Sequence, residues 1–182
     1  MRLTPLPSDQ WDDDVDAALA GMLPRRRRNP VGAGNALSTL VRHPDLVKAF
    51  MPFNVHLLFG STLSDRIREV AILRIAELSA SPYEIEHHTG MGQAAGMTLA
   101  EIEDARRGVA LDPVEQHVLD AVAELHHHHA ILDDTWCALQ NDFDDRQLMD
   151  LVFTVGAYST LSMAFNTFGI EPDRELQPEY ER

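Results

Sequence analysis

The sequence of 182 residues contains one cysteine, Cys137, so no disulfide can form within the chain. It also lacks a secretory signal peptide and any apolar run long enough to span a bilayer. Positive charge is scarce, because the formal net charge is −14, and this disfavours non-specific attraction to nucleic acid or anionic membranes. We therefore expect a cytoplasmic protein that binds neither nucleic acid nor a membrane.

Strand signals are absent as well. No segment alternates apolar and polar residues between turn residues, so the sequence predicts an all-α fold. No solenoid-type repeat is present, and Gly32-Ala33-Gly34 lacks the preceding strand and the Lys-Ser/Thr of a phosphate-binding loop. Because 45% of the residues are apolar, one domain spanning 1–182 with a sizeable core is expected. Residues 1–34 are assigned to an N-terminal helix and connector, and residues 173–182 to a polar tail.

Helical spacing of apolar residues places the other elements. It predicts an amphipathic helix over residues 8–23 and a connector that starts at Pro24. Four consecutive arginines follow at 25–28, where a nucleic-acid or substrate-carboxylate role competes with the more ordinary solvated or interface loop. Further helices are predicted in these ranges: short pieces from residue 35, then 98–108, 113–129, a short helix from 133 or 134, and 145–168.

Two helices at the centre of the chain carry the functional signal. Ser64 is a suitable N-cap for a helix that runs to Leu78. Ser81-Pro82-Tyr83-Glu84 then has the form of a capping box with proline at the first helical position, so a second helix begins at Pro82. The two helices are joined by a tight turn.

Glu69 lies on the apolar face of the first helix, which also carries Ile72, Leu73 and Ala76. A buried carboxylate must be paired, hydrogen-bonded or protonated, because leaving it bare costs several kcal/mol. His88 on the second helix is the candidate partner, and it is an i,i+4 neighbour of Glu84. The sequence therefore predicts a Glu69–His88 acid–base site between two helices. A buried polar network that fixes the helix register is the competing interpretation.

The motifs resemble those of the carboxymuconolactone decarboxylase and alkylhydroperoxidase D-like superfamily. They read Arg68-Glu69-x-Ala71-Ile72-Leu73-Arg74, Tyr83-Glu84-x-x-x-His88 and Ala95-Gly96-Met97-Thr98, and the helix over 145–168 resembles the C-terminal helix of that superfamily. The similarity covers roughly residues 35 to 172. It implies a compact helical domain of about seven to nine helices around a central antiparallel hairpin. It also implies a homotrimer or homohexamer, in keeping with small residues along the last helix.

The sequence departs from the peroxidase branch of this superfamily at two positions. Where the branch has its Cys-x-x-Cys pair, this chain has Ser81 and Glu84. A thiol peroxidase needs a thiolate and a resolving thiol, and neither side chain can form a disulfide. An alkylhydroperoxidase-like antioxidant role is therefore an alternative that the residues oppose.

The decarboxylase branch implies a small carboxylic acid or lactone as substrate and loss of CO₂, a lyase reaction of aromatic-compound catabolism. His88 would be the acid or oxyanion donor, Glu69 would orient it, and Arg68 would supply a cation near the substrate. Ser81 and Tyr83 could add hydrogen bonds, although a capping box explains Ser81 and Glu84 without any function. These residues imply no metal and no organic cofactor. A non-catalytic, acid-binding oligomer is the remaining alternative.

Four further observations stay open at this stage. His56 and Tyr158 could line the same pocket, although a satisfied buried side chain is the more ordinary role for each. The histidine tract 126–129 could bind a metal, but no ligand from a second helix can be predicted. Cys137 is expected to be a small buried side chain.

Overall fold

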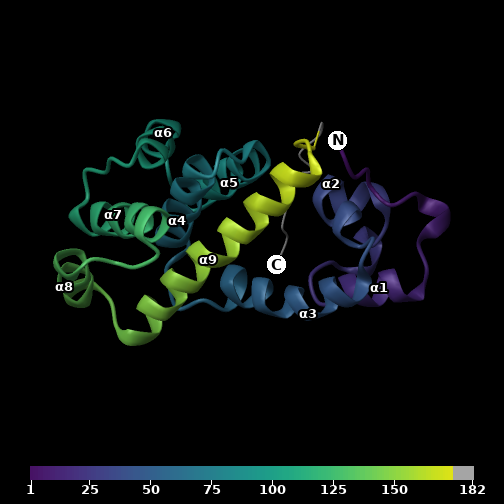
Figure 1. Ribbon diagram of the computed structural model, residues 1–182, viewed down its shortest axis with the longest axis horizontal. Helices are drawn as coiled ribbons and strands as arrows, with labels where there is room; N and C mark the ends of the chain where they lie inside the picture. The colour runs from purple at the N-terminus through teal and green to yellow at the C-terminus, as the bar shows by residue number, and fades with distance from the viewer. Residues whose placement is uncertain (174–182) are drawn as a thin grey trace.

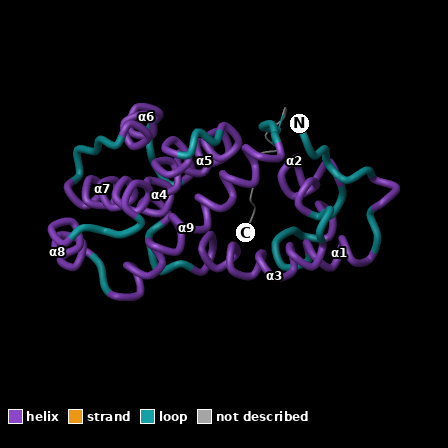
Figure 2. Tube along the Cα trace, viewed as in Figure 1, coloured by secondary structure: helices purple, strands orange, loops and turns teal. Residues whose placement is uncertain are grey.

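The computed structural model describes residues 1–173, and within that range every regular element is helical (Figures 1 and 2). The α-helices are α1 (Asp13–Leu19), α2 (Pro30–Leu40), α3 (Pro44–Val55), α4 (Asp65–Leu78), α5 (Pro82–Ala94), α6 (Leu99–Arg107), α7 (Pro113–His128), α8 (Asp133–Asp142) and α9 (Asp145–Phe168). Short turns of helix occur at η1 (Ser8–Gln10), η2 (Arg25–Arg27) and η3 (His56–Gly60), the last with π geometry. The all-α prediction is confirmed.

Helix α4 lies at the centre of the main core. It packs against α5, α6, α7 and α9, and its middle residues, including Val70, Ile72 and Ile75, are fully buried. A helix that is apolar on nearly all sides is stable only when other helices surround it. The turn after Leu78 folds α5 back along α4, so the predicted helical hairpin is present at the centre of the fold.

Helix α9 runs diagonally between the group formed by α4–α8 and the N-terminal helices α1–α3 (Figure 1). Asp144 and Gln147 form a capping box at its start, and Gly169 ends it in the left-handed conformation, with φ of 69°. The helix is long and apolar enough to cross a membrane by length and composition. However, 56% of its most apolar window is buried within the protein, as expected for a central helix of a soluble-type fold.

The N-terminal helices surround a second, smaller apolar cluster that includes Val15, Leu19, Val41 and Met51. Here two predicted boundaries differ from the structure. The helix expected over 8–23 is reduced to η1 and the short α1, and the connector expected to reach residue 34 ends earlier, because α2 begins at Pro30.

The early start of α2 has a local cause. Asn29 caps the helix by accepting a hydrogen bond from the backbone N–H of Gly32, and Pro30 fits the first helical position. Gly34 then interrupts the helix with φ of 69°, a conformation that glycine adopts without strain. The Gly-Ala-Gly segment is therefore a helix with a break in it, and not a loop.

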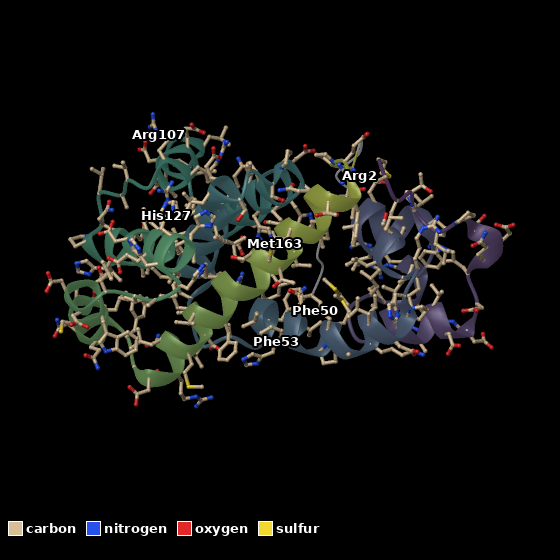
Figure 3. All side chains as sticks on the ribbon, in the orientation of Figure 1. Arg2, Phe50, Phe53, Arg107, His127 and Met163 are labelled. Carbon is tan, nitrogen blue, oxygen red and sulfur yellow. The ribbon has the colours of Figure 1, made fainter. Side chains whose placement is uncertain are left out.

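The two ends of the described chain meet at the end of α9. The backbone N–H of Arg2 donates to the Phe168 carbonyl at 2.7 Å, and Figure 3 shows Arg2 beside this end of the helix. Of the predicted polar tail, 173–182, only Asp173 is among the described residues.

The same substitution in two neighbouring helices tests this account of the core. Leu73 on α4 is fully buried, whereas Leu99 on α6 is 62% exposed. We expect Leu73→Ala to lower the free energy of unfolding by about 2–5 kcal/mol, because it removes buried methyl groups and leaves a cavity. Leu99→Ala should cost less than about 0.5 kcal/mol. Urea denaturation measures both, and equal losses would contradict the central position of α4.

Candidate active site

Glu69 and His88 contact each other between α4 and α5. His88 Nδ1 lies 2.6 Å from Glu69 Oε2, and neither residue is more than 2% exposed. The register of the hairpin brings them together, because each lies on the side of its helix that faces the other. The contact predicted from the sequence is therefore present in the structure.

Glu69 has a second charged partner on its own helix. Arg68 Nε donates to Glu69 Oε1 at 3.0 Å, and Arg68 Nη1 donates to Asp65 Oδ1 at 2.8 Å. Burial by itself would lower the pKa of the Arg68 guanidinium, but the carboxylates of Glu69 and Asp65 raise it above its usual value. Arg68 thus stays charged and compensates the buried charge of Glu69.

Glu84 lies on the opposite side of the His88 ring. Glu84 Oε2 is 3.4 Å from His88 Nε2, and the Glu84 side chain is almost completely buried. The predicted capping box is wrong, because Ser81 makes no side-chain capping bond and its buried Oγ has no hydrogen-bond partner among the described residues. Glu84 is turned toward His88, which lies one helical turn further along the same helix.

The two carboxylates determine the charge of His88. Burial alone would lower the pKa of this imidazole, but Glu69 and Glu84 outweigh burial and raise it to about 9. The next residue behaves in the opposite way, because burial and the neighbouring charge of His88 lower the pKa of His87 to about 4. At neutral pH His88 is therefore an imidazolium and His87 a neutral imidazole.

A cavity of about 520 Å³ opens beside this pair of histidines. Its apolar wall comes from α2, α3, α9 and the segments next to them, and includes Met22, Leu40, Met51, Leu58, Leu161 and Phe165. Its polar wall includes Tyr83, Glu84, His87, His88, Tyr158 and Asp173. Such a volume suits a small organic molecule with one or two polar groups.

The cavity wall includes some of the residues predicted from the sequence and excludes others. Tyr158 lies in the wall, where its ring meets the His88 ring edge to face at 4.9 Å. Tyr83 is also in the wall. Glu69, Arg68 and Ser81 do not line the cavity, so each of them can influence a ligand only through the residues that lie between it and the cavity.

His56 lies outside the cavity wall and belongs to a different cluster. Its Nε2 is 3.1 Å from Asp150 Oδ1 on α9, and the Thr62 backbone N–H and hydroxyl donate to Asp150 Oδ2 at 2.6 and 2.7 Å. These bonds attach the segment after η3 to α9. They account for His56 Nε2 and for both carboxylate oxygens of Asp150 without a ligand.

Three other open questions from the sequence also have answers. Within residues 1–173 no group of three or more His, Cys, Asp or Glu side chains is arranged to hold a metal, and that range includes the tract 126–129. Of the arginine run, Arg28 pairs with Asp16 at 2.8 Å, and Arg27 lines the cavity. The expectation for Cys137 is wrong, because it is exposed on α8, whose buried side is occupied by Leu139.

Sequence reasoning missed the orientation of Glu84 and the place of His87 in the cavity wall. The i,i+4 spacing of Glu84 and His88 could have indicated their contact. The capping pattern at Ser81 gave an equally local explanation, and only the fold decides between the two. Nothing in the sequence indicated that Asn35 or Asp173 would reach this cavity.

These features define an all-helical protein with a buried carboxylate–imidazole site at the wall of a cavity. The model of the carboxymuconolactone decarboxylase family matches residues 44–124, which include Glu69, Glu84 and His88. The match and the fold both agree with the resemblance to the carboxymuconolactone decarboxylase and alkylhydroperoxidase D-like superfamily that the sequence motifs indicate. Among curated proteins no sequence matches the chain.

Solved structures with this fold come from proteins of low identity. A peroxidase-related protein of Ralstonia eutropha JMP134, described as an alkylhydroperoxidase AhpD core, aligns with a TM-score of 0.74 at 17% identity over 96% of this chain and 94% of its own. A peroxidase-related protein of Silicibacter sp. TM1040 aligns with a TM-score of 0.72 at 18% identity, over 98% of this chain and 96% of its own. The debrominase Bmp8 aligns with a TM-score of 0.72 at 14% identity, over 94% of this chain and 92% of its own. At these identities the likeness establishes the fold.

The charge of His88 predicts a pH dependence of stability. Its pKa is about 9 in the folded protein and 6.5 in the unfolded chain, so its contribution is complete below pH 6.5 and is lost as the pH rises to about 9. We expect the wild type to lose about 3 kcal/mol more than His88→Gln over this interval. Urea denaturation at a series of pH values measures the difference. Parallel stability curves for the two proteins would contradict the assignment.

Proposed function

We propose that this protein is a cytoplasmic acid–base enzyme that removes CO₂ from a small carboxylated lactone or oxo-acid. One observation carries the proposal: a His88 imidazolium is held between two buried carboxylates, and one of these, Glu84, forms part of the cavity wall. The site thus stores a proton next to a space that fits a small organic molecule.

The chemistry requires such a proton. When the C–C bond to the carboxylate breaks, CO₂ leaves, and the electron pair moves into a conjugated carbonyl as an enolate. The enolate must be stabilised and then protonated at carbon. His88 carries the proton, and Glu84 lies beside its Nε2 at 3.4 Å, so the proton can pass from His88 through Glu84 to the substrate. Solvent returns a proton to the site after release.

Glu69 and Arg68 are positioning residues in this scheme. The Glu69 carboxylate contacts Nδ1 of His88 and keeps the imidazole ring charged. Arg68 donates a hydrogen bond to the other carboxylate oxygen of Glu69 and compensates its negative charge. Neither residue lines the cavity. In our proposal Arg68 therefore does not bind the substrate, and Tyr158 and Tyr83 are two hydrogen-bonding residues of the cavity wall that can orient it.

The side chains do not favour a thiol mechanism. Ser81 and Glu84 stand where the peroxidase branch has its cysteines, and Cys137 is exposed on α8, outside the cavity wall. Non-catalytic binding of a small acid is the remaining alternative, and measurement of turnover distinguishes it from our proposal. The test is release of CO₂ from a panel of carboxylated lactones and β-oxo acids.

Variants of the site test whether Glu69 and His88 act as one unit. We expect Glu69→Gln and His88→Gln each to lower kcat/KM by about 100-fold or more, the range reported for loss of an acid–base group. The double variant should be little worse than either single variant, because residues that act together are not additive. Glu84→Gln should lower kcat without a comparable change in KM. His127→Gln, on the exposed end of α7, is the matched control and should leave the rate unchanged.

Strictly additive losses would show that the pair does not act as a unit. Unchanged rates in the single variants would place the chemistry elsewhere. Circular dichroism and light scattering of each variant establish beforehand that helicity and assembly are retained.

We also propose that the chain assembles as a homotrimer or homohexamer. Exposed apolar side chains gather on α9 and the end of α3: Phe153 is 52% exposed, Met163 62% and Phe53 38%, and Figure 3 shows Phe53 and Met163 on their helices. Phe53 and Phe153 pack edge to face at 5.9 Å. Gly156 on the same helix has open space beside it, which permits close approach of another subunit. Patches of this kind mark interfaces.

Light scattering tests the assembly. We expect a mass three or six times the 20.4 kDa of the chain, and a lower mass for Phe153→Asp, because a charge there would have to be buried in the interface. Leu111→Asp, at a fully exposed position between α6 and α7, is the control and should keep the wild-type mass. A wild-type mass near that of one chain would rule the assembly out.

A further inference from the structure

The carboxylate of Asp173 is bound at the cavity by groups from two other parts of the chain. The backbone N–H of Asn35 donates to Asp173 Oδ1 at 2.7 Å, and the Tyr83 hydroxyl donates to Asp173 Oδ2 at 3.3 Å. Each oxygen of the carboxylate therefore has its own donor. Asn35 Nδ2 also donates to the carbonyl of Glu171 at 3.0 Å, and this bond holds the segment in place.

The break in α2 makes room for this carboxylate. A Cβ atom on Gly34 would lie 2.6 Å from Asp173 Oδ2, which is closer than real Cβ contacts. Gly34 also has φ of 69°, a conformation that L side chains rarely adopt. Both features require glycine at this position. The backbone conformation of Gly34 also turns the N–H of the next residue, Asn35, toward Asp173.

The residues that surround the Asp173 carboxylate, which we call the carboxylate cradle (Gly34, Asn35 and Tyr83), share one cavity with the acid–base pair. Gly34, Asn35, Tyr83 and Asp173 line the same 520 Å³ space as His88. Tyr83 is 9% exposed and directly precedes Glu84 in the first turn of α5. Tyr83 thus connects the carboxylate cradle to the proton-transfer residues along the chain.

We propose that Gly34, Asn35 and Tyr83 form a carboxylate subsite, which Asp173 fills in this structure and which the carboxylate of a ligand takes when Asp173 moves out. The inference rests on the proposed function, since it assigns the place where an acidic substrate is held. It goes beyond that function in making Asp173 an intramolecular competitor. Both carboxylates need the same donors, and their like charges repel, so they cannot occupy the subsite together.

A purely structural role of Asp173 leads to the opposite expectation. If the contact only fastens residues 171–173 to α2, its removal lowers stability and gains no affinity for anions. If Asp173 is a competitor, its removal makes the subsite vacant and tightens the binding of a carboxylate. Affinity for a simple acid therefore distinguishes the two roles.

The experiment compares benzoate with benzamide on the full chain by isothermal titration calorimetry. Benzamide has the same ring and nearly the same shape but no charge. We expect Asp173→Ala to bind benzoate about tenfold more tightly than the wild type, a change typical of a vacated charge-assisted hydrogen-bond site. Its affinity for benzamide should be unchanged.

Glu171→Ala is the matched control. Glu171 also lines the cavity and carries the same charge, but its side chain is 65% exposed, and its carboxylate lies near the N-terminal amino group. If the tighter binding of benzoate came only from removing a negative charge that repels the anion, both Asp173→Ala and Glu171→Ala would show it. We expect Glu171→Ala to change benzoate affinity less than about twofold, because an exposed charge is screened by solvent.

The backbone amide of Asn35 gives a second readout. In Asp173→Ala, benzoate should shift the Asn35 amide resonance in NMR spectra, and adding Tyr83→Phe should remove most of the gained affinity. If Asp173→Ala does not fold, the same resonance is followed in the wild type at saturating benzoate. Unchanged benzoate affinity in Asp173→Ala, or binding that leaves the Asn35 resonance in place, would overturn the proposal. Tight benzoate binding without CO₂ release from any acid would support the subsite and count against the proposed reaction.

Discussion

The structure depends on the burial of one carboxylate. Glu69 is fully buried in the central helix, where an unpaired charge would cost several kcal/mol. Arg68 compensates this charge from the same helix, and His88 compensates it from α5. The pairing therefore requires that α4 and α5 pack in one register, since a shift of one residue would turn His88 away from Glu69. The constraint that orders the hairpin also builds the site.

The same pairing separates two adjacent histidines chemically. His88 gains a proton because carboxylates lie on both sides of its ring, whereas burial, together with the neighbouring charge of His88, lowers the pKa of His87 and keeps it neutral. Neighbouring groups whose pKa values are moved apart are typical of acid–base sites. Solved structures share this fold under names that range from peroxidase-related protein to debrominase, so side chains on a common scaffold decide the chemistry.

Local sequence signals predicted much of this arrangement. Helical spacing and caps located the hairpin, and the burial of Glu69 on an apolar face identified His88 as its partner. The sequence predicts a capping role for Glu84, because the Ser81-Pro82 pattern has the same local form whether or not the Ser81 hydroxyl accepts a capping hydrogen bond. The contacts of Asp173 could not be predicted, because they join residues far apart in sequence and depend on how α9 directs the chain back to α2. An apolar run just before α4 makes His56 a candidate for the cavity, but the contact of its ring with Asp150 depends on how α9 packs against this segment.

The central claim is that His88 is an imidazolium held from both sides by buried carboxylates. Nitrogen NMR of the His88 ring at neutral pH tests it most directly, with His87 as an internal comparison in the same spectrum. The account predicts that both ring nitrogens of His88 carry protons while His87 carries one, and that Glu69→Gln moves the pKa of His88 from about 9 toward 6.5. A neutral His88 ring at neutral pH would contradict the account.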